Sequence, residues 1–492
     1  MRDYKQRRSA YPAFLNVMGH GLRERLGVSD SAGETEKPVL SEAEADAAYD
    51  KFVMDNLKRN YAGHYVHGML GMTGFRLVNT PTFVPAYLHS ISGSDFWVGI
   101  GTSLQQLGGI VSPIIGAQQI EHRKKILPVS VMLGLLMRAQ ILGLAISGWF
   151  LGGWPALAFA LVFLFLLGVF QGPQRVAFQL LLAKVIPIRL RGRLQAWRNL
   201  TGGLIAALLS YFAGSWLVAN HVWGNGYATT FFLAFVLTSL GLSALQMLMR
   251  EPEPASVRER KSLRERMKDF PSLIREDAGF AWFMVARSLA MGSRIGQPFF
   301  FLYAAYVLGI SAEANPEAFG TTLAIISLAY MGADTVTNLI WGYLSDRQGF
   351  RSTFVISLAI NIVGVAALMM SHSIATFAIA FFMIGAAQSG YMMSTSNIVL
   401  EYGHRHDVPM RMALSNTAEG AMGALAPLLG AGLVVWLGYE ASFYATIVTM
   451  VAALIVLVWK VDEPRRRRLA KLGAGGLGPD GLGSDGLGSD GK

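Results

Sequence analysis

The amino-acid sequence predicts an all-α membrane protein with twelve transmembrane helices in two pseudo-symmetric six-helix bundles. Three observations predict this fold: a high apolar content, twelve long apolar runs and an internal repeat. Of the 492 residues, 52% are hydrophobic and 15% are charged, whereas a soluble protein usually carries about 25% charged residues. The mean hydropathy is +0.39. This composition overrides the expectation of several soluble domains that the length alone would suggest.

The apolar runs are long enough to be membrane spans, because a helix that crosses the hydrocarbon core needs about 20 apolar residues. Most of the connections between the runs are too short for an additional domain. The predicted spans are 61–88, 95–117, 126–148, 155–184, 199–219, 228–249, 279–308, 319–343, 353–371, 374–400, 412–437 and 441–460.

The distribution of Lys and Arg predicts the orientation, because short cytoplasmic loops carry an excess of these residues. With the N-terminus inside, the five inner loops hold nineteen Lys and Arg, and the six outer loops hold none. We therefore expect a multi-pass protein of the cell inner (plasma) membrane with both termini in the cytoplasm. This topology also accounts for the formal charge of +10 without nucleic acid as a partner.

The predicted organisation has five parts. Residues 1–60 form a cytoplasmic segment, in which Ser41 and Glu44 have capping-box spacing before a short amphipathic helix at 45–57. The two bundles occupy 61–249 and 279–460. A highly charged cytoplasmic linker at 250–278, which suits an interfacial helix, joins them. The glycine-rich tail at 461–492 is expected to be disordered.

Several classes of chemistry are excluded or disfavoured by the residues. The chain has no cysteine, so thiol nucleophiles and cysteine-based metal sites are impossible. No Ser/His/Asp set, phosphate loop or His-Glu-x-x-His pattern is present, and we expect neither an enzyme nor a cofactor. His64 and His67 have spacing that suits a metal ion, but without a third ligand they are interpreted as structural.

The two halves repeat each other at the residue level. Arg76 in the first span and Arg294 in the seventh are each followed by an amide, Asn79 or Gln297, and then closely by a proline. The fourth and tenth spans share a glycine three residues before a glutamine, namely Gly168 with Gln171 and Gly385 with Gln388. Parallel repeats of this kind place a substrate site between the halves near the midplane.

The loop between the eighth and ninth spans holds a motif of small and charged residues, namely Gly342, Asp346, Arg347, Gly349 and Arg351. This motif resembles the cytoplasmic signature of the major facilitator superfamily, and the resemblance covers about residues 60–465. In that signature a glycine that permits close helix contact precedes an aspartate that pairs with basic groups, so the set implies a conformational latch on the inner side.

The first-half counterpart of this motif departs from the family pattern. Ile120 stands where the aspartate is expected, and Glu121 is its candidate substitute. Arg191, in a Pro-x-Arg-x-Arg-Gly loop between the fourth and fifth spans, is a candidate positive partner for the latch.

The resemblance implies that the first and seventh spans line a central cavity. An arginine on each is similar to the arrangement in organophosphate/phosphate antiporters of this superfamily, and guanidinium groups suit carboxylate or phosphate. The candidate substrate-binding residues are Arg76, Asn79, Arg294, Gln297, Gln171 and Gln388. The alternative is structural: the two arginines form buried ion pairs with Asp334 and Glu419. Gln171 and Gln388 then form hydrogen bonds between helices.

Asp334 and Glu419 are the candidate coupling residues, because an acid within a span is costly and usually has a function. For Asp334 the alternative is permanent pairing, and for Glu419 it is an inner gate. Arg138 is interpreted as structural. Arg175 and Arg287 lie close enough to the cytoplasmic side to extend their charges into water, so neither is expected in the site.

The leading hypothesis is a secondary active transporter that moves a small solute, here a small organic anion, by alternating access. Its expected partners are this solute, with a proton as the candidate coupling ion, and the lipid bilayer, and the protein is expected to be monomeric. Proton-linked drug antiporters of the superfamily carry an arginine where Gly168 stands and proline in the fifth span, where 199–219 has none. An exporter of amphipathic compounds therefore stays an alternative, as does a non-transporting sensor or scaffold.

Overall fold

The computed structural model describes residues 42–120, 123, 125–252, 274–275, 277–402 and 408–463. Ser41, Glu121, most of the predicted linker helix and the glycine-rich tail lie outside these residues. The chain divides into two compact units, Met1–Ala48 and Tyr49–Lys492. Everything below concerns the second unit, apart from helix α2 (Glu42–Asp55), which crosses the boundary and replaces the helix predicted at 45–57.

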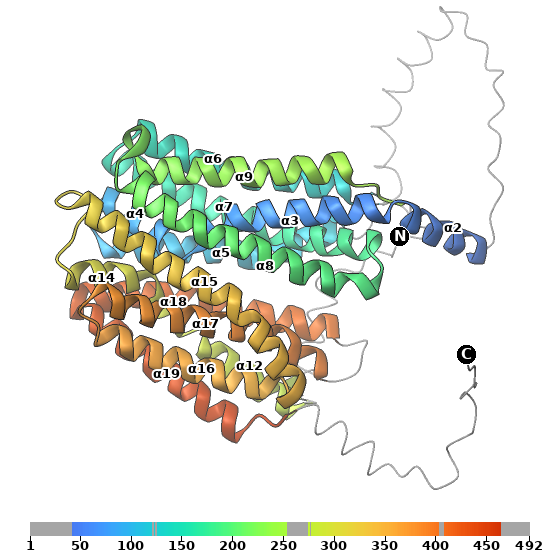
Figure 1. Ribbon diagram of the computed structural model, residues 1–492. Coiled ribbons are helices and arrows are strands. Elements are labelled where there is room, and N and C mark those ends of the chain that lie inside the picture. Colours follow the sequence, from blue (N-terminus) through green and yellow to red (C-terminus); the bar gives the residue numbers. More distant parts are fainter. Residues whose placement is uncertain are drawn as a thin grey trace, which may run out of the picture. The chain divides into compact units, whose positions relative to one another are not determined.

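The first half of the chain forms six helical membrane segments, drawn from blue to green in Figure 1. They are α3 (Leu57–Asn79) with α4 (Phe83–Ser92), α5 (Asp95–Ile120), α6 (Leu127–Phe150), α7 (Gly153–Val185), α8 (Ile188–Phe212) with a π-helical turn (Ala213–Val218), and α9 (Gly226–Leu248).

The second half repeats the pattern, in yellow to red in Figure 1. Its segments are α12 (Ala278–Ala290), α13 (Ser293–Gly296) and α14 (Phe300–Val307), then α15 (Pro316–Gln348), α16 (Phe350–Met369), α17 (Ile374–Ile398), α18 (Val408–Leu437) and α19 (Tyr439–Trp459). Helices thus occupy all twelve predicted segments, and the described residues include no β-strand. In the same residues, nine helices are long and apolar enough to cross a membrane.

Spans 1 and 7 are interrupted helices. Span 1 breaks after Asn79, where Thr80 has extended backbone (φ −67°, ψ 147°), because a following proline disfavours the helical conformation of its predecessor. Span 7 passes through a turn at 291–292 and a 3₁₀ turn at Gln297–Phe299 that contains Pro298. The break in span 1 follows Arg76 and Asn79, whereas span 7 is interrupted before Arg294 and again at Gln297, so in both spans the helix is broken next to the repeated residues.

Local polar groups explain where several other helices begin. The Asn225 side chain accepts hydrogen bonds from the backbone amides of Tyr227 and Ala228 at the start of α9. Ser373 and Thr376 form a reciprocal capping box at the start of α17. Such caps satisfy amide groups that have no partner within the helix.

A polar cluster joins α2 and α7 to the start of α6 and to the residues that follow α9. Glu251 accepts hydrogen bonds from the backbone amides of Ile126 and Leu127 and pairs with Lys184 at 2.9 Å. The Tyr49 hydroxyl donates to the Lys184 carbonyl oxygen at 3.0 Å. Burial, and then the Glu251 charge, raise the pKa of Tyr49, so Tyr49 remains a hydrogen-bond donor at neutral pH.

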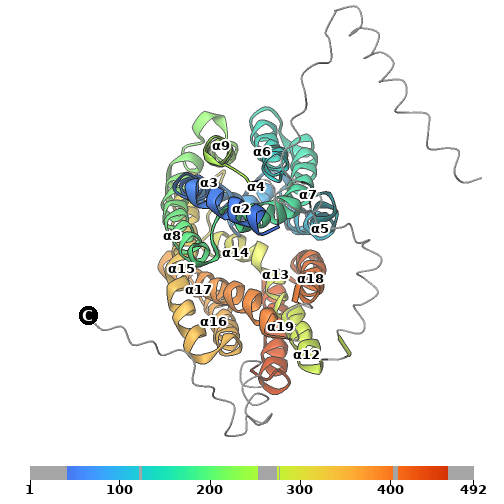
Figure 2. The ribbon, with the colours of Figure 1, turned by 90° about the vertical axis from the view of Figure 1, so that its right-hand side faces the viewer.

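The two halves meet along two helix pairs, α5 with α18 and α8 with α15, which lie side by side in the end view of Figure 2. Within each half, a glycine allows the fourth helix to approach the second. A Cβ at Gly168 would lie 2.0 Å from the Gln105 carbonyl oxygen, and one at Gly385 would lie 2.2 Å from the Tyr330 carbonyl oxygen. The repeated glycines therefore have the same packing role in both halves.

Candidate functional site

A polar cluster joins α3 of the first half to α15 of the second. Arg76 Nη1 lies 2.9 Å from Asp334 Oδ2, and the same nitrogen donates to Thr335 Oγ1 at 2.9 Å. The two charged side chains are 20% and 22% exposed, so they are partly accessible although both helices are membrane segments. Arg76 and Asp334 are therefore paired in this conformation.

The repeated amides occupy equivalent positions beside this ion pair. Gln105 on α5 donates to Asn79 Oδ1 at 2.8 Å. In the second half, Gln297 donates to the Tyr330 hydroxyl of α15 at 3.4 Å. Gln105 and Tyr330 are also the residues whose carbonyl oxygens face the repeated glycines. The two halves thus build related polar corners from the first and second helices of each bundle.

Arg294 differs from the other span arginines in its surroundings. Its side chain is half-buried, and it makes no hydrogen bond or ion pair with any residue that the structure describes. Tyr330 lies within electrostatic range of Arg294, Arg76 and Asp334. Arg294 therefore carries its charge close to Tyr330, which also lies near the Arg76–Asp334 pair.

Arg287 corrects the sequence analysis, which had placed its charge in water. It is 5% exposed and forms an ion pair with Glu419, which also accepts a hydrogen bond from the Tyr391 hydroxyl at 3.2 Å. Arg287 also donates to Ser415 and, at 3.2 Å, to Asn416. Glu419 consequently pairs with Arg287, not with Arg294 as the structural alternative required.

The remaining buried polar residues divide between the two interpretations. Arg138 is 1% exposed and donates to the backbone carbonyls of Gly134 and Thr238 at 2.7 Å, which is a structural role. Gln171 and Gln388 are half-buried and make no hydrogen bond with a described residue. The structure does not bring them into contact with the Arg76–Asp334 pair.

The latch residues make contacts within their own halves. Arg347 lies over the Tyr343 ring at 4.4 Å, and Arg351 donates to the carbonyls of Leu457 and Val458 at the end of α19. Arg191 donates to the carbonyls of Ala183 and Ile186, at 2.7 Å each.

The two glycines of the motif have different surroundings. A Cβ at Gly342 would meet only the end of Met393, at 3.9 Å, so the expected close helix contact is absent there. Gly349 has φ +90°, a conformation that favours glycine, and a Cβ there would lie 2.5 Å from the Glu463 carboxyl group. Asp346 has a partner as well. The motif thus tightens the α15–α16 turn against the residues after α19.

The two histidines of α3 are buried against α7. His64 and His67 lie 5.0 and 5.3 Å from the Phe178 ring, and the Arg198 guanidinium lies 4.9 Å from the same ring. The described residues contain no group of three His, Asp or Glu that could hold a metal ion.

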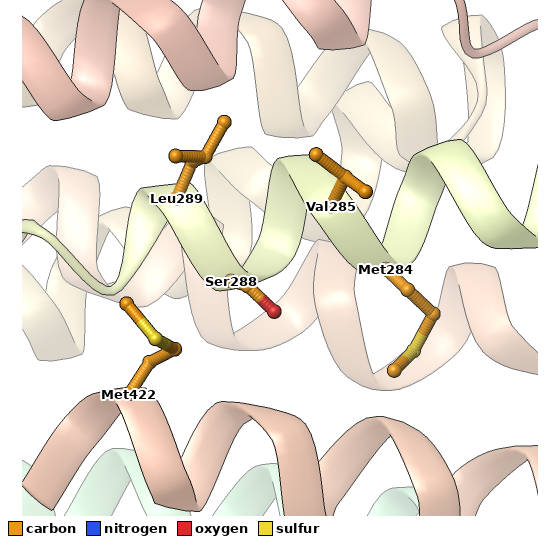
Figure 3. Close-up of a pocket in the computed structure, with 5 residues that line it drawn as sticks. All are labelled: Met284, Val285, Ser288, Leu289 and Met422. Atoms are coloured by element: carbon orange, nitrogen blue, oxygen red, sulfur yellow. The ribbon is translucent and has the colours of Figure 1, made fainter.

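A separate pocket of about 330 Å³ lies between α12 and α18 (Figure 3). Its lining consists of Met284, Val285, Ser288, Leu289 and Met422. Met284 and Ser288 point toward α18, from which Met422 extends in return (Figure 3). The pocket contains none of the residues that the sequence singled out.

Sequence reasoning missed Tyr330, Gln105 and the partners of Arg287. Gln105 carried a usable signal, because a glutamine within a span resembles Gln171 and Gln388, which were selected. Tyr330 had no such signal, since tyrosines are common in membrane helices.

The comparisons with known proteins agree with this architecture. Residues 314–479 match the family model described as Major Facilitator Superfamily. The multidrug efflux pump SdrM of Staphylococcus aureus (strain N315) is 27% identical over 156 residues, which are 31% of this chain and 34% of that protein. The tetracenomycin C resistance and export protein of Streptomyces glaucescens is 30% identical over 148 residues, 30% of this chain and 27% of that protein. The alignments thus span about a third of the curated relatives.

Solved structures share the fold over most of the chain at low identity. A mutant of the nucleoside transporter NupG has a TM-score of 0.67 at 11% identity and covers 82% of this chain and 100% of its own. A D-xylose–proton symporter has a TM-score of 0.60 at 13% identity, with 84% and 99% covered. The human organic anion transporter MFSD10 (TETRAN) has a TM-score of 0.57 at 14% identity, and the match covers 81% of this chain and 99% of that protein.

These proteins are transporters or exporters by name, not enzymes, and the structural likeness extends over both halves of the chain. The family match covers residues 314–479, which include the Gly342–Arg351 motif but not the first span of the second half. The repeat extends the same helix arrangement to the first half. The chain is therefore a multi-pass membrane protein whose residues 314–479 match the Major Facilitator Superfamily model and whose two halves share the fold of these solved transporters.

Proposed function

We propose that this protein is a secondary transporter that moves a small organic anion across the membrane by alternating access between its halves. The observation that carries the proposal is Arg294, a half-buried span arginine without a polar partner among the described residues. An arginine stays protonated in proteins, and burying its charge without a counter-charge is costly. An anionic substrate group would supply that counter-charge.

The contacts between the halves support a role for conformational change. Arg76 pairs with Asp334, Ser327 donates to Thr82 at 2.8 Å, and Ser103 donates to the Ala424 carbonyl. Each of these contacts joins a residue of the first half to one of the second. Alternating access requires that these contacts break when the two halves separate where the contacts join them.

Asp334 is the proposed coupling residue, because it is the acid at the boundary between the halves. A proton on Asp334 would remove its attraction for Arg76 and so favour separation. Glu419 is paired within the second half, which supports a gate or a structural role more than direct coupling. For the topology, we propose cytoplasmic termini in the inner membrane, with the Gly342–Arg351 motif as an inner latch.

The test begins with ligand-induced thermal stabilisation of the purified, detergent-solubilised protein. The probes are glycerol 3-phosphate, gluconate and inorganic phosphate, with glycerol and glucose as neutral counterparts. We expect an anion to raise the Tm of the wild type and of the control Arg175→Gln, which removes an exposed charge on α7. Arg294→Lys and Arg294→Gln should lose this shift.

Transport is then measured in proteoliposomes with the anion that stabilises the wild type. Arg294→Lys should insert normally but lose transport, because an ammonium cannot reproduce the forked contacts of a guanidinium. Unchanged flux in both Arg294 variants would overturn the anion site. If none of the solutes raises the Tm of the protein and none is transported, the sensor or scaffold alternative is favoured.

A second candidate function is export of amphipathic compounds. The methionine-lined pocket between α12 and α18 favours it, since methionine side chains adapt to apolar ligands of different shapes. The two curated relatives are named as a multidrug efflux pump and as a resistance and export protein. Ethidium efflux from cells that express the protein discriminates this function, because ethidium is an amphipathic cation that Arg294 would repel.

A further inference from the structure

The pocket between α12 and α18 has the chemistry of a site for an apolar chain. Of its five lining residues, only Ser288 carries a polar group, and Met284 of α12 and Met422 of α18 both extend into the space between the two helices (Figure 3). Its volume of about 330 Å³ lies at the lower end of the range for small-molecule sites. A flexible hydrocarbon or aryl group fits this lining better than a polar solute does.

The corresponding helix pair of the first half has closed this space. A Cβ at Gly68 of α3 would lie 1.4 Å from Arg198 Cδ of α8, and one at Gly202 would lie 3.0 Å from the Met69 carbonyl oxygen. α3 and α8 are thus in close contact where α12 and α18 leave a pocket. The opening is a specific feature of the second half and not a general consequence of the fold.

The pocket is open at the surface of the helices. On α12, Val285 in the lining is 42% exposed and the neighbouring Trp282 is 40% exposed. Exposed apolar side chains on a membrane segment contact lipid tails, because polar surfaces are excluded from the hydrocarbon region. A membrane-dissolved chain therefore has direct access to the pocket.

The pocket lining on α12 and Arg294 on α13 belong to the same broken span. Met422 precedes Gly423, whose Cβ position lies 3.8 Å from Met291 Sδ and 3.9 Å from Gln106 Oε1. Met291 in turn lies between Leu289 of the pocket and Arg294 on the same broken span. Leu289 and Arg294 are five residues apart along the chain, with the turn at 291–292 between them.

We propose that the substrate is an amphipathic organic anion, with its anionic group on Arg294 and its apolar chain in the α12–α18 pocket. This inference rests on the proposed function and names the substrate class of the same site. It also explains how the cationic side chain of Arg294 and the methionine-lined pocket serve one ligand. This ligand reaches the transporter laterally from the bilayer.

The test uses the purified full-length protein and the fluorescence of dansylundecanoic acid on binding. Its carboxamide supplies the same chain without the charge, and dansylglycine supplies the charge without the chain. Met422→Trp fills the pocket, Met422→Leu preserves its apolar character, and Arg294→Gln removes the head-group contact. Ile379→Trp adds the same indole at a lipid-facing position on α17, where Ile379 is 61% exposed.

We expect saturable binding of dansylundecanoic acid to the wild type, to Met422→Leu and to Ile379→Trp. Met422→Trp should weaken binding of the acid by about tenfold or more, since a lost contact of about 1.4 kcal/mol is tenfold in affinity. Arg294→Gln should weaken binding of the acid but not binding of the carboxamide. Ser288→Phe fills the pocket from the opposite side and should reproduce Met422→Trp, which guards against misfolding of a single variant.

Two results overturn the inference. One is wild-type protein that shows no saturable binding of dansylundecanoic acid, and the other is unchanged affinity in both Met422→Trp and Ser288→Phe. If Arg294→Gln weakens dansylglycine while the pocket variants change nothing, the anion site stands and the chain site fails. If Arg294→Gln changes the affinity for no anion, the proposed function itself fails.

Discussion

The guanidinium of Arg76 on α3 and the carboxylate of Asp334 on α15 form an ion pair 2.9 Å long that joins the two halves of the chain. The same guanidinium nitrogen also bonds Thr335. An ion pair within one bundle can persist through a rigid-body movement, whereas a pair between bundles must break when they separate. Arg76–Asp334 is therefore placed where a change of charge would shift the balance between conformations.

Asp334→Asn should reduce stability and uncouple transport from the proton gradient. Both partners are about a fifth exposed, so the loss should be about 1–2 kcal/mol, less than the 3–5 kcal/mol typical of fully buried pairs. A double-mutant cycle with Arg76→Gln, read from unfolding in detergent, measures the coupling energy. Solute counterflow should persist in Asp334→Asn while proton-driven accumulation is lost. Undiminished accumulation would exclude Asp334 as the coupling residue.

A disulfide between positions 82 and 327 should lock the halves together. The Thr82 and Ser327 side-chain oxygens are 2.8 Å apart, so paired cysteines there need only a small adjustment to reach disulfide geometry. The native chain has no cysteine, and Thr82→Cys/Ser327→Cys therefore has no competing thiol. Oxidation should stop transport and reduction should restore it, as measured in proteoliposomes. Each single cysteine variant serves as the control, and full transport by the cross-linked protein would contradict the movement.

Glu419→Gln should destabilise the protein more than Asp334→Asn does. Arg287 is 5% exposed and would lose the only carboxylate that pairs with it in the described part of the chain. Leaving a buried charge uncompensated costs about 3–5 kcal/mol. Unfolding in detergent measures this loss, and Arg287→Met/Glu419→Leu should recover part of it. If Glu419→Gln instead leaves stability unchanged but abolishes proton-driven accumulation, Glu419 is the coupling residue.

The sequence was sufficient to predict the twelve segments and the repeat, because span length and small-residue spacing are local properties of the chain. Proline did not predict the breaks in spans 1 and 7, since membrane helices often accommodate proline. The surroundings of Arg287 could not be predicted from its depth along the helix. Depth indicates whether a side chain can reach water, but the contacts with Ser415, Asn416 and Glu419 arise from the packing of α12 against α18.

The candidate site was predicted only in part, for a related reason. Arg76, Asn79, Arg294 and Gln297 were selected because they repeat, and the structure brings three of them into polar contacts or electrostatic range of one cluster. Which arginine is paired depends on the arrangement of the two halves, since Asp334 contacts Arg76 across the boundary. Sequence periodicity within one helix contains no information on that choice.

The repeated glycines provide a test of the symmetry that the site depends on. Gly168→Ala and Gly385→Ala each place a methyl group about 2 Å from a backbone carbonyl oxygen, that of Gln105 or Tyr330. The backbone cannot move aside as a flexible side chain does, so both variants should lose about 1–3 kcal/mol by overpacking. Gly332→Ala on α15 is the matched control, because its Cβ would have no neighbour within 4 Å, and it should be neutral or slightly stabilising through its higher helix propensity.

Because Gln105 and Tyr330 also form hydrogen bonds with Asn79 and Gln297, both overpacked variants should weaken binding of an anion that stabilises the wild type. Loss of stability in only one of the two would show that the halves do not use this packing equivalently.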